Sequence, residues 1–131
     1  MGTRSLTHVY DENERLVTMY RQFDGYLSGH GKALHDFLAS LTMTNGLPCR
    51  EAEVRYANGA CCLAAQMIAH FKKGPGDIYI MTPGNHGQDY EYTVNIDEDM
   101  NIKVSVSGYE GTLLSDATLD QFLEFIKRED D

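Results

Sequence analysis

The sequence predicts an α+β fold in which helices cover one face of an antiparallel sheet. Two kinds of pattern indicate it: alternating apolar and polar residues, typical of strands with one buried face, and apolar residues at helical spacing. The expected order is ββ-α-α-βββ-α, and no linker or repeat divides residues 1–131 into more than a single domain. The strands are expected at 5–10, 15–23, 77–82, 90–96 and 102–106, the last two as a hairpin, and the helices at 32–41, 58–73 and 118–126. The last helix should open on a capping box formed by Thr118 and Gln121.

The first hairpin sets where the charged residues of the N-terminal strand should lie. Its polar turn, 11–14, has an even number of residues, and this register pairs Arg4 with Arg21. Two arginines side by side repel each other unless a negative charge offsets them. Either a carboxylate, such as that of Asp24, or a bound phosphate would supply that charge. The apolar face of the same hairpin would carry Leu6, Val17, Met19 and Phe23.

A glycine-rich loop, 24–32, lies directly before the first helix and is the first candidate binding site. Backbone N–H groups exposed at the positive end of a helix bind anions. The spacing of a phosphate-binding P-loop is absent, because Tyr26 and Ala33 stand where that motif has glycine and Ser or Thr. A plain turn with Ser28 as the helix N-cap is the structural alternative. The residues expected to contact a ligand are Arg4, Arg21, Asp24, Gly25, Tyr26, Ser28, Gly29, His30, Gly31, His86 and Gln88.

A second polar loop, 85–88, raises the alternative of catalysis. His86, together with His30 and Asp24, would supply an acid and a base if the fold brought these side chains together. No spacing in the sequence enforces that meeting, so no catalytic residue is assigned. Whether the protein is an enzyme is left open, and a role without catalysis is favoured.

The chain is acidic, with 20 Asp and Glu residues against 11 Lys and Arg residues and a formal net charge of −9. This balance disfavours unspecific binding to nucleic acids and to anionic membranes. No apolar stretch approaches the roughly 18 residues of a membrane span, so we expect a cytoplasmic protein. Cys49, Cys61 and Cys62 lack the spacing of zinc ligands, and neither a metal nor another cofactor is predicted.

Four short segments are distinctive: Gly-Thr-Arg-Ser-Leu at 2–6, Tyr-Arg-Gln-Phe-Asp-Gly-Tyr at 20–26, Ser-Gly-His-Gly at 28–31 and Gly-Gln-Asp-Tyr-Glu-Tyr at 87–92. Together they resemble a group of small uncharacterised proteins of bacteriophages and their hosts. Members of that group commonly have proline after the Asp-Gly-Tyr, where this chain has Leu27. The resemblance implies a viral or mobile-element setting, in the cytoplasm of an infected bacterium, and no particular chemistry.

The leading hypothesis is a phage-type protein that sequesters a small anionic ligand, a nucleotide signal of host defence, without turning it over. Arginines, tyrosines that stack on bases and a glycine-rich loop suit such a sponge. Two alternatives stay open. One is a small nucleotide hydrolase or transferase that uses His30 or His86, and the other is an interaction protein that inhibits a host enzyme or mimics DNA.

The helices also suggest that the protein is a homo-oligomer with its ligand site near a subunit boundary. The helix at 58–73 has a face of small residues beside its apolar stripe, and the last helix is apolar over a wide arc. Apolar area beyond the stripe that faces a sheet usually marks an interface. Packing of the helices on one another within the monomer is the alternative. The small residues are Cys61, Ala65 and Ala69.

Overall fold

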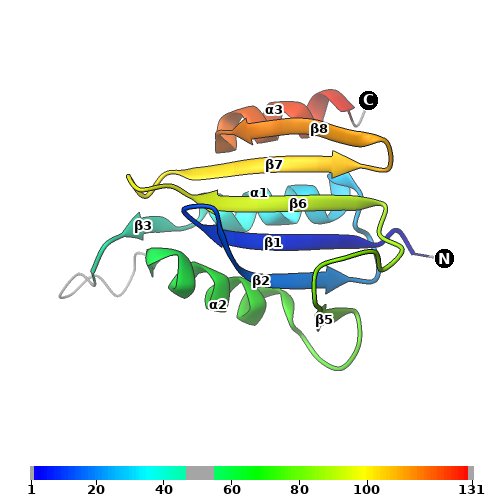
Figure 1. The fold of residues 1–131 in the computed structure, drawn as a ribbon, viewed down its shortest axis with the longest axis horizontal. Helices are drawn as coiled ribbons and strands as arrows, with labels where there is room; N and C mark the ends of the chain where they lie inside the picture. Colours follow the sequence, from blue (N-terminus) through cyan, green and yellow to red (C-terminus); the bar gives the residue numbers. More distant parts are fainter. Residues whose placement is uncertain (1, 47–54, 130–131) are drawn as a thin grey trace.

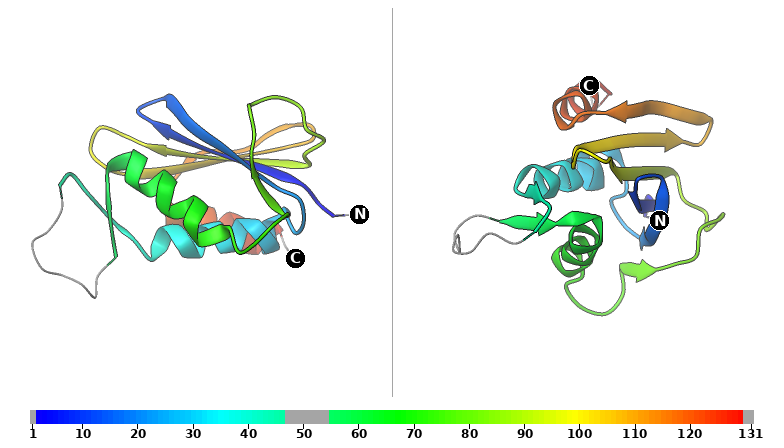
Figure 2. Two further views of the ribbon diagram at one scale, coloured as in Figure 1. Left: turned by 90° about the horizontal axis from the view of Figure 1, so that it is seen from below. Right: turned by 60° about the vertical axis from the view of Figure 1, so that its left-hand side comes forward.

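The described residues, 2–46 and 55–129, form an α+β structure with a mixed six-stranded sheet and three α-helices on one of its faces (Figures 1 and 2). This architecture comes from a computed structural model of the chain. The strand order across the sheet is β5-β2-β1-β6-β7-β8, and a separate sheet pairs β3 with β4. The strands are β1 (Ser5–Asp11), β2 (Glu14–Arg21), β3 (Thr42–Thr44), β4 (Tyr56–Asn58), β5 (Ile78–Ile80), β6 (Tyr90–Ile96), β7 (Ile102–Gly108) and β8 (Gly111–Ala117).

The helices begin and end close to where the sequence placed them. The last helix opens on the expected capping box: the Gln121 N–H donates to the Thr118 hydroxyl at 3.2 Å, and the Thr118 N–H donates to the Gln121 side chain at 2.9 Å. No described helix is long and apolar enough to cross a membrane. The helical segments are η1 (Leu27–Gly31, a π-helix), α1 (Lys32–Ala39), α2 (Gly59–Phe71) and α3 (Leu119–Glu129).

The expected α+β class is confirmed, but the expected antiparallel sheet and element order need correction. β1 and β6 pair in parallel, because the chain crosses over the sheet between β5 and β6 instead of turning back as a hairpin. The order also contains β3, β4 and β8, which the sequence analysis did not include. β8 reads Gly-Thr-Leu-Leu-Ser-Asp-Ala, and this sequence lacks the alternation by which the other strands were recognised.

A β-bulge changes the register predicted for the first hairpin. The pairing of β1 with β2 shifts between Val9 and Tyr10, so that Arg21 lies opposite Ser5. A shift of one residue moves every later side chain to the other face of the sheet. The expected pairing of Arg4 with Arg21 is therefore wrong.

The face of the sheet toward the helices carries the core. Met19 and Tyr92 lie on either side of Thr7 in neighbouring strands, and both are fully buried against the helices. Leu63 of α2 and Phe122 of α3 belong to the same cluster and are also fully buried. Because Thr7 lies between these two core residues, Thr7 and Ser5 of β1 face the helices, and Thr7 contacts His30 of η1.

The opposite face of the sheet is covered near one end by the β5–β6 connection, residues 81–89 (Figure 2). Leu6 pairs with Tyr20 on this face, and both are buried although neither belongs to the core cluster. The expectation that Leu6 shares a face with Met19 is therefore wrong, and the bulge is the reason.

The two helix faces that suggested an oligomer differ in the fold. The apolar arc of α3 is used mostly inside the domain, because Phe122, Phe125 and Ile126 are buried in the core. This arc therefore gives no support to an interface, and the homo-oligomer stays a prediction. The small residues of α2 are exposed: Cys61, Ala65 and Ala69.

The loop between β2 and η1 approaches β1 closely. The Gly25 N–H donates to the Thr3 carbonyl at 2.8 Å, and the Gly25 carbonyl accepts from the Tyr92 hydroxyl at 2.8 Å. A Cβ atom on Gly25 would lie 2.8 Å from the Ser5 Cβ and 2.9 Å from the Arg4 carbonyl carbon. Only glycine lets the loop backbone rest on the strand at this position.

We predict that Gly25→Ala lowers the free energy of unfolding by about 1–3 kcal/mol, because the added methyl group overpacks the contact with Ser5. Urea unfolding followed by circular dichroism measures this change. Gly74→Ala is the matched control, since no atom lies within 4 Å of its added Cβ. Equal unfolding midpoints for Gly25→Ala and the wild type would contradict the prediction.

Candidate functional site

The candidate loop lies at one end of the sheet, where β2 ends and β1 and β6 begin, at the right of Figure 1. Four residues of adjacent strands form a row there on the helix side of the sheet, which we call the end row. Gly25 of the loop rests on the third of them. The end row consists of Ile78, Arg21, Ser5 and Tyr90.

A chain of hydrogen bonds holds Arg21 in this row. Its NH1 group donates to Nδ1 of His30 at 3.0 Å, and its Nε–H donates to the Phe23 carbonyl at 2.8 Å. Because a guanidinium only donates, Nδ1 must be the accepting nitrogen, and the imidazole proton sits on Nε2. Nε2–H then donates to the Thr7 hydroxyl at 2.8 Å. The tautomer of His30 is thus set by its two neighbours.

His30 is fully buried between two aromatic rings, with centroid distances of 5.0 Å to Phe71 and 5.2 Å to Tyr92. Burial and, second, the charge of Arg21 lower the pKa of His30 to about 3. The imidazole is therefore neutral near pH 7, and both of its nitrogens are engaged. His30 is placed to orient Arg21 and has no free nitrogen to serve as a general base.

Asp24 does not orient the His30 ring, as the catalytic alternative required. It contacts His30 through the backbone, with its carbonyl accepting from the His30 N–H at 2.7 Å. The Asp24 carboxylate instead accepts from the Tyr26 hydroxyl at 3.4 Å, a long hydrogen bond at the surface. The structure does not assemble the His30–Asp24 pair that a hydrolase would need.

The Arg21 charge has no counter-charge close to it. Among the described residues no carboxylate oxygen lies within 4.0 Å of its guanidinium. Its side-chain partner, His30, is neutral, and the arginine is half-buried. Removing a charge from water without pairing it is costly, so such groups are characteristic of sites that receive an anion.

Ser5, next to Arg21 in the end row, has a hydroxyl group with no hydrogen-bond partner among the described residues, and the residue is fully buried. A buried hydroxyl without a partner costs about 1–3 kcal/mol. A polar atom of a bound molecule or a water would satisfy it. The end row therefore contains two polar groups whose bonding capacity is incompletely used.

A hollow of about 260 Å³ lies between the end of α2 and β5, and neither Arg21 nor Ser5 is among its lining residues. Phe71, which contacts the His30 ring, and Ile78, which lies opposite Arg21, both line it. Lys73 also lines this hollow. The Asp77 carboxylate, also in the lining, accepts from the Phe23 N–H at 3.1 Å.

Two aromatic rings on the same loop are exposed to solvent. Phe23 is 48 % exposed and Tyr26 is 41 % exposed. Exposed rings of this size next to a cation suit a planar group, since an aromatic face stacks on a base.

The backbone of the loop does not form the expected anion cradle. Four N–H groups already donate to carbonyls within the protein, and η1 begins at Leu27, which places the exposed Ser28 inside the helical turn and not at its N-cap. The expectation of a glycine cradle, and the alternative of a Ser28 cap, are both corrected. The donor–acceptor pairs are Gly25 with Thr3, Gly29 and Gly31 with Tyr26, and His30 with Asp24.

The other expected ligand residues lie in or against the β5–β6 connection. The Arg4 guanidinium is so close to Gly87 that a Cβ added there would lie 2.7 Å from NH1. Nε2–H of His86 donates to the Thr82 carbonyl at 2.7 Å, and the Gln88 side-chain oxygen accepts from the His86 N–H at 2.7 Å. These contacts hold the connection in shape, on the face of the sheet away from His30 (Figure 2). The fold therefore does not bring His86 and His30 together.

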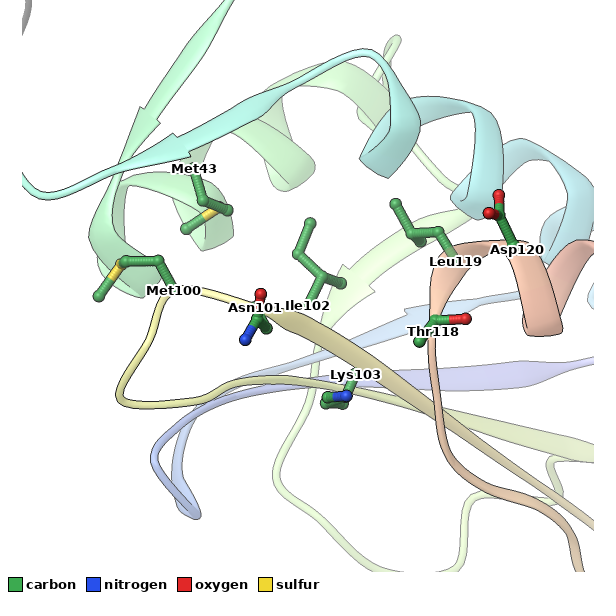
Figure 3. A pocket seen from close by; sticks show the side chains of 8 residues that line it. All are labelled: Met43, Met100, Asn101, Ile102, Lys103, Thr118, Leu119 and Asp120. Carbon is green, nitrogen blue, oxygen red and sulfur yellow. The ribbon is translucent and has the colours of Figure 1, made fainter.

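A further hollow, of about 470 Å³, lies near the opposite end of the sheet (Figure 3). Met43, Ile102 and Leu119 give it an apolar floor from β3, β7 and α3. It contains none of the residues that the sequence predicted as ligand contacts. Across the described part of the chain, no group of three or more His, Cys, Asp or Glu side chains is arranged to hold a metal ion. The remaining lining residues are Met100, Asn101, Lys103, Thr118 and Asp120.

Sequence reasoning missed Ser5 and Thr7 as members of the site. Ser5, Thr7 and Val9 alternate along β1 and share its buried face. A polar side chain on the buried face of a strand needs a hydrogen-bond partner, so two polar residues in line with Val9 could have indicated a site. Phe71 could not be assigned from the sequence, because its contact with His30 depends on how α2 packs.

Comparison of the chain with protein-family models, with curated proteins and with solved structures finds no match in any of the three.

We predict a pH dependence of stability that comes from His30. Its folded pKa of about 3 lies below its ordinary value of 6.5, so the unfolded chain takes up the proton first as the pH falls. This contribution to stability is complete above pH 6.5 and is lost toward pH 3, at up to about 1.4 kcal/mol per pH unit.

His30→Gln removes this titration while keeping an acceptor and a donor, so the stability advantage of the wild type should shrink as the pH falls through this window. Urea unfolding of both proteins at several pH values measures it. A difference that stays constant through the window would show that His30 is not held neutral by the fold.

Proposed function

We propose that the protein binds a small anionic ligand of the nucleotide class at the end row and releases it chemically unchanged. The observation that carries the proposal is the half-buried Arg21 guanidinium, which is held in place by a neutral histidine and has no carboxylate within 4.0 Å among the described residues. An arginine oriented by neutral acceptors keeps donors available for a phosphate or carboxylate.

The surroundings of Arg21 support a ligand with both an anionic and a planar part. The hollow of about 260 Å³ lined by Ile78, the strand neighbour of Arg21, has room for a group of phosphate size, and both the Lys73 ammonium and the Asp77 carboxylate line it. The exposed rings of Phe23 and Tyr26 would stack on a base. Sugar phosphates without a base would lack this second contact, and we expect them to bind more weakly.

Binding without turnover is favoured over hydrolysis because no general base faces the proposed ligand. His30 is buried with both nitrogens engaged, and His86 lies in the connection on the other face of the sheet. In the phage setting that the sequence resemblance implies, such a protein would act as a sponge for a nucleotide signal of host defence. Nucleotide signals are therefore the first ligands to test.

We predict that isothermal titration calorimetry detects binding to at least one member of a panel of linear and cyclic nucleotides. Arg21→Gln should weaken that binding by roughly 10-fold to 100-fold, the loss of a charge-assisted hydrogen bond of about 1.5–3 kcal/mol. Arg15→Gln, at the other end of β2, is the matched control and should bind as the wild type does.

Arg21→Lys provides a second variant if Arg21→Gln is poorly folded, because lysine keeps the charge but not the hydrogen bonds to His30 and Phe23. Absence of binding at millimolar concentration of every nucleotide would overturn the proposal. New products recovered after denaturing the complex would instead favour the hydrolase or transferase alternative.

A further inference from the structure

β8 forms one edge of the six-stranded sheet, and it is bordered by a groove. The groove is a hollow of about 440 Å³ between β8 and the outer side of α3. Leu114 lines it from β8, together with Ala117, which is only 2 % exposed. Charged side chains from α3 form its other wall: Asp120, Glu124 and Arg128.

The charges of this wall are not paired with one another. Glu124 and Arg128 stand four residues apart on α3, at a spacing that often forms an ion pair. Within the described residues, however, no ion pair within 4.0 Å joins them. Arg128 lies 4.0 Å from the Glu129 carboxylate, and its guanidinium lies over the Phe125 ring, 5.8 Å from the ring centroid. Both side chains line the groove. An acidic and a basic group thus stand one helical turn apart on the same wall, available to groups outside the chain.

This pattern is complementary to itself when reversed. If a second copy packs against the groove about a twofold axis perpendicular to α3, its α3 runs antiparallel to the first. An axis that passes between Glu124 and Arg128 then places the Glu124 of each copy opposite the Arg128 of the other, which gives two equivalent contacts. Leu114 lines the same groove and is partly buried against the core of its own domain.

We propose that the β8–α3 groove is the interface of a homodimer, formed by reciprocal contacts of Glu124 with Arg128 beside Leu114. Leu113 and Tyr109, which are also exposed on this edge, line a separate hollow and are not part of the contact. Charges of both signs that have no ion-pair partner across a groove are complementary to a partner that carries the same charges in reverse order.

Side chains, not a continued β-ladder, form this interface. β8 pairs irregularly with β7, with register shifts between Val104 and Val106 and between Val106 and Ser107. The Asp116 N–H is turned toward the Ser105 hydroxyl, to which it donates at 3.0 Å. Such irregularities bend an edge strand and disfavour strand-to-strand pairing between molecules. The groove beside the strand stays open to a partner helix.

Charge reversal tests this arrangement. In the wild type, multi-angle light scattering at micromolar concentration should give a mass of about twice the 14.7 kDa of the chain. Arg128→Glu and Glu124→Lys each place like charges opposite one another, and each should raise the dimer dissociation constant roughly tenfold or more. Lys127→Glu, the neighbouring residue outside the groove lining, makes the same change in charge as Arg128→Glu and should leave the dimer intact.

Mixing distinguishes a second copy from any other partner. When the Arg128→Glu and Glu124→Lys proteins are combined, opposite charges face each other again in the heterodimer, and the dimer mass should return. The double variant Glu124→Lys/Arg128→Glu should dimerise by itself for the same reason.

A wild-type mass near 14.7 kDa at micromolar concentration would overturn the proposal. So would single variants that dissociate but are not restored by mixing, or a Lys127→Glu variant that dissociates as readily. The inference does not depend on ligand binding at the end row, because mass is measured without a nucleotide.

Discussion

The hydrogen bond from the Arg21 guanidinium to Nδ1 of His30 ties the loop before α1 to the end of the sheet. It depends on burial, because only a neutral imidazole can accept from a guanidinium, and burial is the largest cause of the lowered pKa of His30. The same imidazole donates to Thr7, so loop, β2 and β1 are joined by one side chain. The position of the free Arg21 donors follows from this arrangement.

The bulge between Val9 and Tyr10 decides which groups share that environment. With a regular hairpin, Arg4 would stand beside Arg21 and the two charges would repel each other. The shifted register puts the neutral Ser5 beside Arg21, and Arg4 is held against Gly87 of the β5–β6 connection. One extra residue in a strand therefore separates two arginines and leaves one of them in the end row.

The sequence was informative where local physics decides the outcome. Alternation predicted the β6–β7 hairpin, and the Thr118–Gln121 pair predicted the start of α3, because both signals are set within a few residues. The parallel pairing of β1 with β6 could not be predicted, since it depends on the path of a connection that has no periodicity. For the site, the sequence indicated Arg21 and the loop, but not that His30 would be buried as the partner of Arg21.

Net charge and local charge act separately in this fold. β1 and β6 are parallel, so the acidic turns that follow them, 11–14 and 97–99, lie together at the end of the sheet opposite Arg21 (Figure 1). A strand of seven residues separates the two ends, a distance of roughly 20 Å. The Debye length at physiological salt is about 8 Å, so solvent screens most of the repulsion that these carboxylates would exert on an approaching anion. A formal net charge of −9 therefore does not by itself prevent an anion from approaching Arg21 at the other end of the sheet.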